Sequence, residues 1–414
     1  MCRSSFFLSN GYVCLSLWAV LFSNIVCLAQ KDSLTVDVNG LLKPHLASTH
    51  HFGLFSSRMT QNFKARASTS PQLHLETQSG NNFHAPVQAF LPDDPELRAQ
   101  FADQTWYFRV FDFVDQETTP AQIMDIEIDA VYKIYRPALT LPLNDHNEIR
   151  IGLRAFQTVK GDFFDSPFTN DESIEWFHSN IAGGEDPFGR KFYGVNEVAV
   201  NYTDRNGKRL NMQAGDIILG GLELAHTYYP QLEKWNERHL FFNLQSQIGW
   251  NTSAYNNSLD LGIGINTIKK YNLNTRSNLW FGLGYSVLYK NAIDGSDNLD
   301  LGNNRFLGSG EVMAQWTHQT SKGHQNIIGL NYQNQTSYFK KEEANYFHLK
   351  GNYAAINQGW HYGYTTLIEN LSSWSMLYTH ARPKISYTIY VKEDLNVNNA
   401  PDVETGISVQ IPFY

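Results

Sequence analysis

The sequence predicts an all-β protein, a closed antiparallel transmembrane β-barrel of about 12–16 strands, with about 14 as the best estimate. Segments in which every second residue is apolar recur along most of the chain, and the chain ends on an aromatic residue. Side chains of a strand alternate between its two faces, so each segment has one apolar and one polar face. A membrane barrel has such strands, with the apolar face toward lipid and the polar face toward the lumen.

The last strand shows the pattern most completely. Its apolar or β-branched positions are Val403, Thr405, Ile407, Val409, Ile411 and Phe413. A secreted β-sandwich is the competing fold, because its strands also alternate. The segments 259–265 and 279–289 carry more apolar rows than one modest core needs, and the terminal Tyr414 also favours a barrel.

The N-terminus predicts export. Residues 12–29 are uncharged and Arg3 is the only charged residue before Lys31. The run ends at Cys27-Leu28-Ala29, with small residues at positions −3 and −1 of a cleavage site. We therefore expect residues 1–29 to be a cleaved signal peptide and residues 30–414 to form one outer-membrane barrel domain.

Composition excludes several classes of site. All three cysteines lie in the predicted signal peptide, so the mature chain has no thiol, disulfide or thiolate metal site. Cleavage removes one Arg from 32 basic residues, which leaves 31 basic against 40 acidic groups, a net charge of −9. An acidic balance argues against a nucleic-acid partner. No metal or phosphate-binding motif is present, and we expect no metal and no cofactor.

Two segments predict charges inside the barrel. Asp125, Glu127 and Asp129 alternate with apolar residues in the segment 124–134, and Arg150 and Arg154 do so in the segment 148–155. A charge that faces lipid at mid-depth costs roughly 2–4 kcal/mol, so we expect all five to face the lumen. The sequence thus predicts ion pairs across the lumen and a role for these residues in selectivity.

Residues 158–192 interrupt the strand pattern. Ile174, Phe177 and Ile181 recur at helical spacing before the two glycines at 183–184, which predicts a short amphipathic helix. Counting strands places this insert on the periplasmic side, either beneath the barrel or folded into it as a plug. Its candidate functional residues are Asp162, Asp165, Glu175, Trp176, His178, Glu185, Asp186 and Arg190.

Two interpretations of this insert remain open. Glu175 and His178 are three residues apart on the predicted helix and could share a ligand or a proton. Alternatively, Trp176 and Phe177 dock the helix on the barrel rim while the acidic residues cap turns.

Two other features have less specific interpretations. Residues 30–68 are weakly patterned, and their adjacent His50 and His51 lack the further ligands of a metal site. The motifs Gly-Ile-Gly at 262–264 and Gly-Leu-Gly at 282–284 are interpreted as strand glycines that relieve crowding in a curved wall.

Several stretches resemble a family of exported bacterial β-barrel proteins catalogued as a domain of unknown function. They are Gly161-Asp-Phe-Phe-Asp-Ser166, Ser173-Ile-Glu-Trp-Phe-His178, Gly183-Gly-Glu-Asp-Pro-Phe-Gly-Arg190, Gly215-Asp-Ile-Ile-Leu-Gly-Gly221 and Leu259-Asp-Leu-Gly-Ile-Gly264. The resemblance covers most of the mature chain and is most specific over 161–190. It implies an outer-membrane barrel and no defined activity. In the usual barrel ending, the apolar residues of the last strand are in register with the C-terminal aromatic residue. Here they are in register with Phe413, one residue before Tyr414, and Pro412 interrupts the end of the strand.

These observations predict a non-enzymatic pore or channel for small polar solutes in the cell outer membrane. We expect its partners to be outer-membrane lipid, the barrel-assembly machinery during insertion, and a small solute. One alternative is a barrel enzyme acting on lipid or envelope polymer, although no Ser and His spacing indicates catalysis. Another is a structural or surface barrel without transport.

Overall fold

The computed structural model describes most of the predicted mature chain. The described residues are 38–48, 50–91, 105–106, 109–110, 122–161, 166–182, 195–204, 206–295, 297–340, 367–394 and 403–413. The predicted signal peptide lies outside them. The alternation also predicts strands at 344–354 and 359–368, and all of the first and most of the second lie outside the described residues.

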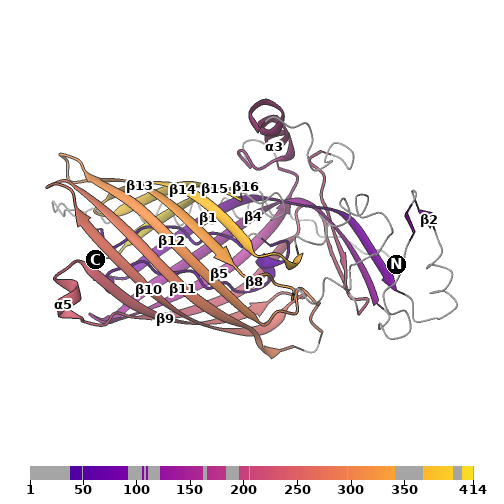
Figure 1. The fold of residues 1–414 in the computed structure, drawn as a ribbon, viewed down its shortest axis with the longest axis horizontal. Coiled ribbons are helices and arrows are strands. Elements are labelled where there is room, and N and C mark those ends of the chain that lie inside the picture. Colours follow the sequence, from indigo (N-terminus) through magenta and orange to yellow (C-terminus); the bar gives the residue numbers. More distant parts are fainter. Residues whose placement is uncertain are drawn as a thin grey trace, which may run out of the picture. The chain divides into compact units, whose positions relative to one another are not determined.

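The architecture is a closed antiparallel barrel (Figure 1). Fourteen strands share one sheet, and two of these lie outside the closed wall, which leaves twelve in the barrel. Closure follows because β1 pairs with β16 on one side and with β4 on the other. The twelve are β1 (Gln72–Leu91), β4 (Gln122–Asn144), β5 (Asn147–Val159), β8 (Ile217–Tyr228), β9 (Leu240–Thr252), β10 (Asn257–Asn272), β11 (Ser277–Asp294), β12 (Phe306–Gln319), β13 (Gln325–Gln335), β14 (Leu371–Arg382), β15 (Ile385–Glu393) and β16 (Val403–Pro412).

The two remaining strands of the sheet form a hairpin, β6 (Ala199–Thr203) and β7 (Arg209–Met212). The hairpin pairs with residues 125–129 of β4, which extend beyond the barrel wall. Because the overhanging edge of β4 needs a hydrogen-bonding partner, the hairpin protects it. The estimate of about 14 strands therefore fits the sheet, but the closed barrel has twelve. A separate pair consists of β2 (Thr105–Trp106) and β3 (Arg109–Val110).

The two ends of the barrel differ in their connections. Short turns join β4 to β5, β12 to β13 and β14 to β15 at one end, which we call the short-turn end. The helix α5 (Glu233–Asn236) also lies there (Figure 1). Longer connections join β5 to β8, β11 to β12 and β13 to β14 at the opposite end, which we call the long-loop end.

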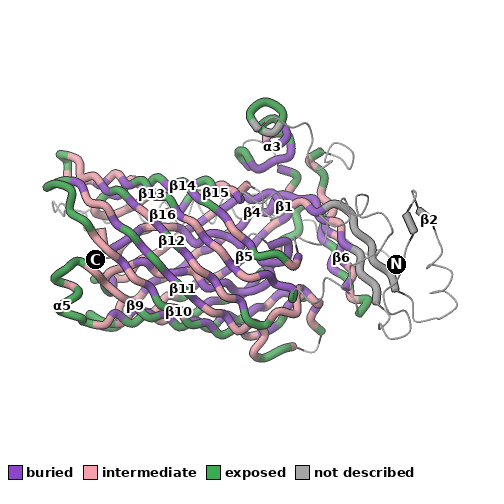
Figure 2. Tube along the Cα trace, viewed as in Figure 1, coloured by how far each residue is buried: buried purple, intermediate pink, exposed green. Residues whose placement is uncertain are grey.

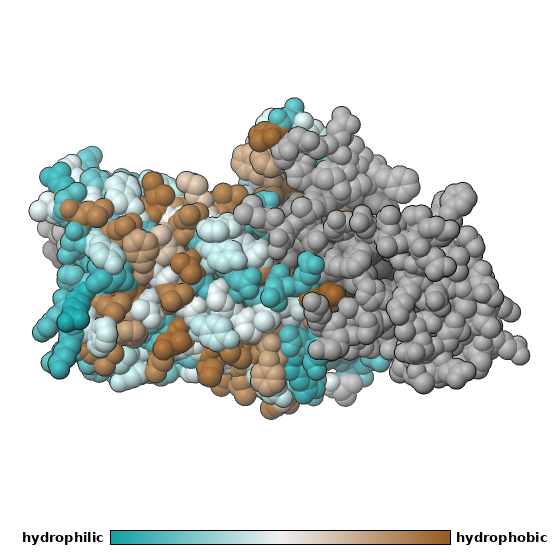
Figure 3. Space-filling model, viewed as in Figure 1, coloured by the Kyte–Doolittle hydropathy of each residue, from teal (hydrophilic) through white to brown (hydrophobic). Residues whose placement is uncertain are grey.

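The outer wall is apolar, as the alternation predicts. Along β10 and β11, Leu261, Ile263, Phe281 and Leu283 are exposed, whereas Asp260 and Asn266 on the other face of β10 are buried. Figure 2 shows the alternation along the strands, and Figure 3 shows apolar residues across the wall. Among the described residues, no helix is long and apolar enough to cross a membrane. A wall of exposed apolar side chains on a closed barrel fits lipid rather than water.

One strand has the opposite phase to that predicted. In β4 the even residues Ile128, Tyr132 and Ile134 are buried in an internal hydrophobic cluster, so this apolar face points inward. The reason is that protein, not lipid, covers the apolar face. In β5 the predicted phase is correct, since Ile151 is exposed and Arg154 is buried.

A charge on the lipid-facing wall tests this fold. Ile263 is 68% exposed in the middle of β10, and we expect Ile263→Arg to lower the free energy of unfolding by roughly 2–4 kcal/mol in lipid vesicles. Leu273→Arg is the matched control, because Leu273 is 55% exposed but lies in the turn after β10, where the cost falls to about 0–1 kcal/mol. Equal effects in urea titrations of the two folded variants would show that the wall faces water.

Candidate functional site: the plugged lumen

Residues 38–68 run through the inside of the barrel, and we call this segment the plug. Its two legs are joined by the hydrogen bond from Leu41 N to Phe63 O at 3.0 Å. The tip between them contains a 3-10 turn, η1 (Gly53–Phe55). None of its described residues, 38–48 and 50–68, forms a strand, so the segment is not a member of the wall. The sequence interpretation did not identify it.

Side chains of the wall bind the backbone of the plug. Three alternate polar residues of β9 follow the returning leg from Arg58 to Lys64. Gln247 Nε2 donates to Arg58 O (3.0 Å), Gln245 bonds Thr60 O (3.1 Å) and Asn62 N (2.9 Å), and Asn243 Nδ2 donates to Asn62 O (2.7 Å) and Lys64 O (2.9 Å). An extended segment outside the sheet is thereby supplied with hydrogen-bond partners.

Glycines of the wall make room for the same leg. A Cβ atom added to Gly249 would lie 2.2 Å from Ser57 Oγ, and one added to Gly284 would lie 2.2 Å from Gln61 Cγ. Gly262 and Gly282 lie in the same way beneath Met59 and Phe63. The glycines of 262–264 and 282–284 therefore do more than relieve wall curvature, because the plug occupies the space that side chains would fill.

Buried ion pairs tie the plug to the wall. Lys43 pairs with Glu311, and Lys64 Nζ lies 3.1 Å from Glu148 Oε1. A third pair lies within the wall, where Lys392 Nζ is 2.6 Å from Glu404 Oε2 and also donates to Ala47 O of the plug at 2.8 Å. Removing one partner of a buried pair leaves an uncompensated charge.

The two arginines expected in the lumen lie there. Arg154 Nη1 is 2.7 Å from Glu223 Oε1, and Arg154 Nη2 donates to Asn251 Oδ1 at 2.6 Å. Arg150 lines a polar cavity of about 130 Å³ between the plug and the wall. Lys43, His45, Glu76 and Glu148 also line this cavity. The guanidinium of Arg150 makes no hydrogen bond or ion pair with the residues that the structure describes.

The three acids expected opposite these arginines lie elsewhere. Asp125, Glu127 and Asp129 belong to the overhanging part of β4 that pairs with β6, outside the closed wall. Glu127 accepts a hydrogen bond from Asn201 Nδ2 at 3.3 Å, and Asp129 is buried. The Asp125 side chain lies outside the described part of the chain. Glu223 therefore takes the place of the expected acids as the partner of Arg154.

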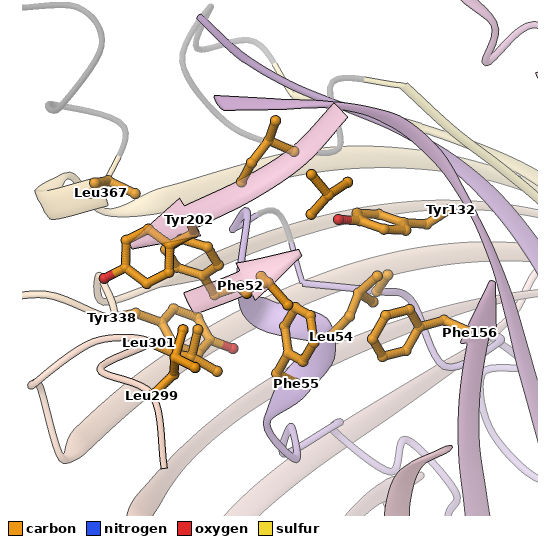
Figure 4. Packing of buried hydrophobic residues seen from close by; sticks show 14 of the residues in the cluster. Phe52, Leu54, Phe55, Tyr132, Phe156, Tyr202, Leu299, Leu301, Tyr338 and Leu367 are labelled. Carbon is orange, nitrogen blue, oxygen red and sulfur yellow. The ribbon is translucent and has the colours of Figure 1, made fainter. Parts of the chain in front are cut away.

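A hydrophobic cluster surrounds the tip of the plug at the long-loop end (Figure 4). Phe52 packs on Tyr202 of β6 with ring centroids 4.6 Å apart, and Phe55 packs on Phe156 of β5 at 5.1 Å. Other members come from β4 and from the connections of the long-loop end, namely Tyr132, Leu299, Leu301, Tyr338 and Leu367. The β6–β7 hairpin and these connections thus cover the tip.

His50 lies at the tip of the plug, where its ring stacks on Tyr338 with centroids 4.5 Å apart. The buried imidazole therefore acts as a packing group.

The insert at 158–192 is not the plug. Its helix α3 (Asp171–Phe177) and the π-helical turn η2 (His178–Ala182) lie outside the barrel wall (Figure 1). Ile174 and Glu175 are buried, whereas Trp176 and Phe177 are exposed, so the expected docking of the two aromatic residues on the rim is wrong. The remaining candidates lie outside the described residues: Asp162, Asp165, Glu185, Asp186, Arg190 and the side chain of His178.

Comparison with known proteins gives only distant structural matches. No family model and no curated protein matches the chain, so no model supports the family suggested by sequence resemblance. An outer-membrane channel from Pseudomonas putida F1 matches with a TM-score of 0.37 at 9% identity, over 86% of this chain and 100% of the channel. The NanC porin matches with a TM-score of 0.34 at 6% identity, over 82% and 99% of the two chains. The β domain of the Bordetella autotransporter BrkA matches with a TM-score of 0.36 at 7% identity, over 83% and 100%.

This chain is an outer-membrane β-barrel. The lipid-facing wall and the ladder closure between β1 and β4 carry that conclusion. The plug fills the lumen of this barrel. The sequence shows alternate polar residues on β9 and pairs of glycines on β10 and β11. Together they indicate that an extended segment of the chain lies inside the barrel.

A larger side chain at one plug-facing glycine tests the fit of the plug. We expect Gly284→Leu to displace the returning leg, because overpacking of a filled core costs about 1–3 kcal/mol. Trypsin should then cut at Arg58 or Lys64 in barrels that still migrate as folded on a gel. Gly310→Leu is the matched control, since nothing lies within 4 Å of a Cβ atom added there. Equal resistance of both variants to trypsin would contradict the assignment.

Proposed function

We propose that the protein is a channel for small polar solutes across the outer membrane, and that the plug holds it closed. The observation that supports this most is the nature of the contacts between plug and wall. They are hydrogen bonds and ion pairs with wall side chains, such as Gln245 with Asn62 and Lys43 with Glu311. Water can replace these partners when the plug moves, because a hydrogen bond to protein is exchanged for one to water.

The lumen is wider than one that the side chains of the wall would fill by themselves. Barrels of about eight strands have an interior that their own side chains fill, whereas this barrel has twelve strands. Here the wall instead presents polar residues and glycines, which together form a polar passage once the plug is removed. Arg150 is the best placed of the expected selectivity residues, because it lines the cavity beside the plug.

The proposal includes an orientation. Bacterial barrels have short periplasmic turns and longer external loops, so the short-turn end would face the periplasm. The chain would then enter the plug from the periplasm, and the insert at 158–192 would lie on the outer side rather than the periplasmic side. Insertion by the barrel-assembly machinery and a small solute as ligand belong to the same proposal.

A structural barrel is the second candidate. The hydrophobic cluster at the tip favours it, because Phe52, Phe55 and the β6–β7 hairpin close the long-loop end with apolar contacts. These contacts resist water more than the polar contacts deeper in the lumen.

A reversible disulfide between the plug and the wall tests the channel against the structural barrel. A Cβ atom added to Gly284 would lie 3.1 Å from Gln61 Cβ, close to the roughly 3.5–4.5 Å of a disulfide. Since the mature chain has no cysteine, Gln61→Cys with Gly284→Cys creates one defined pair. In planar bilayers we expect the oxidised protein to be silent, the reduced protein to open intermittently, and a chain lacking residues 38–68 to conduct steadily.

The single variant Gln61→Cys controls for the substitution and should behave alike under oxidising and reducing conditions. A folded barrel that lacks residues 38–68 and still carries no current would refute the channel and support the structural candidate.

A further inference from the structure

The insert outside the wall exposes an unusual set of side chains. Residues 166–182 of the insert form a short loop, α3 and η2. Four large apolar side chains stand in solvent-accessible positions, namely Phe168 (63% exposed), Trp176 (59%), Phe177 (46%) and Ile181 (61%). A water-soluble surface of this size would not gather four such groups.

Polar contacts hold the opposite side of the insert against the barrel. Ser79 of β1 and Thr169 share a hydrogen bond of 2.6 Å between their hydroxyl oxygens, and Asn81 Nδ2 donates to Asp171 Oδ1 at 2.9 Å. Ile174 is buried on this side. The insert is therefore held on the barrel, while Trp176, Phe177 and Ile181 stay exposed.

The insert also continues the lipid-facing wall. Thr405 of β16 donates to Pro167 O at 3.0 Å, which places the loop directly over the outer surface. Pro167 and Phe168 line an open groove of about 860 Å³ together with residues of β1, Lys133 of β4 and the apolar outward residues of four further strands. Those residues are Ile328 of β13, Met376 and Tyr378 of β14, Ile389 and Val391 of β15, and Ile407 of β16.

The backbone of Phe168 has a conformation that its surroundings must hold in place. Its φ of 64° lies in the left-handed region, which an aromatic residue rarely adopts. Such a conformation persists only where its surroundings hold it, and it occurs preferentially at functional positions. Here it directs the chain between the groove and the start of α3.

We propose that residues 166–182 are a membrane-surface anchor for the leaflet at the long-loop end. Phe168, Trp176, Phe177 and Ile181 enter the boundary between headgroups and acyl chains, where aromatic side chains are favoured. A lipid acyl chain occupies the groove beneath Phe168, because the groove is continuous with a wall that already contacts hydrocarbon. The anchor is independent of whether the barrel conducts.

An environment-sensitive label tests the anchor. Single cysteines at Trp176→Cys and Phe168→Cys, in a mature chain with no other thiol, accept the fluorophore NBD without cross-reaction. The labelled full-length protein is placed in dioleoyl phosphatidylcholine vesicles, with nitroxide groups on the acyl chains of a fraction of the lipid. We expect blue-shifted emission and several-fold stronger nitroxide quenching at both positions than at Asn206→Cys.

Asn206 is the matched control, because it is an exposed polar residue of the β6–β7 turn and does not belong to the insert. If Trp176→Cys fails to fold, Ile181→Cys reports on the same surface. Full quenching by aqueous iodide at all of these positions, with no nitroxide effect, would overturn the proposal.

Discussion

A backbone that crosses the barrel without joining the sheet must find hydrogen-bond partners elsewhere, and this requirement governs the lumen. The plug occupies membrane depth, where unsatisfied amide groups are costly. Wall side chains supply the partners, most regularly through Asn243, Gln245 and Gln247 of β9. The same approach of backbone to wall requires glycine at positions such as 249 and 284. The plug thus explains both the polar residues and the glycines on the inner face of the wall.

The lumen changes character along its length. Toward the start of β5, the plug is held by polar contacts around Glu148, and a cavity remains beside Arg150. At the long-loop end the tip is packed by Phe156, Tyr202 and Tyr338. Polar contacts exchange readily with water, whereas apolar packing must be broken together. In the proposed channel, the hydrophobic cluster at the tip therefore sets the energy barrier to opening. The polar contacts of the returning leg line the path that the solute would take.

The strand pattern predicted the wall well and the interior poorly. The exposed rows of Leu261, Ile263 and Leu283 follow the alternation, because lipid covers every outward residue alike. In β4 the same alternation has the reverse phase, since Tyr132 and Ile134 are covered by the plug tip and its neighbours. The plug escaped prediction for a different reason. Its partners are side chains from distant strands, so it has neither helical nor strand periodicity.

The sequence by itself determined that this chain forms an antiparallel barrel with an apolar exterior, because a period of two is a local property of each strand. It also indicated an export signal and an interruption at 158–192. Only the tertiary structure decided that twelve strands close the wall, that residues 38–68 fill it, and that the insert stands outside with Trp176 exposed. These three features depend on what covers each face of a strand or helix. An apolar face can be covered by lipid or by the plug tip, and the local sequence pattern is the same in both cases.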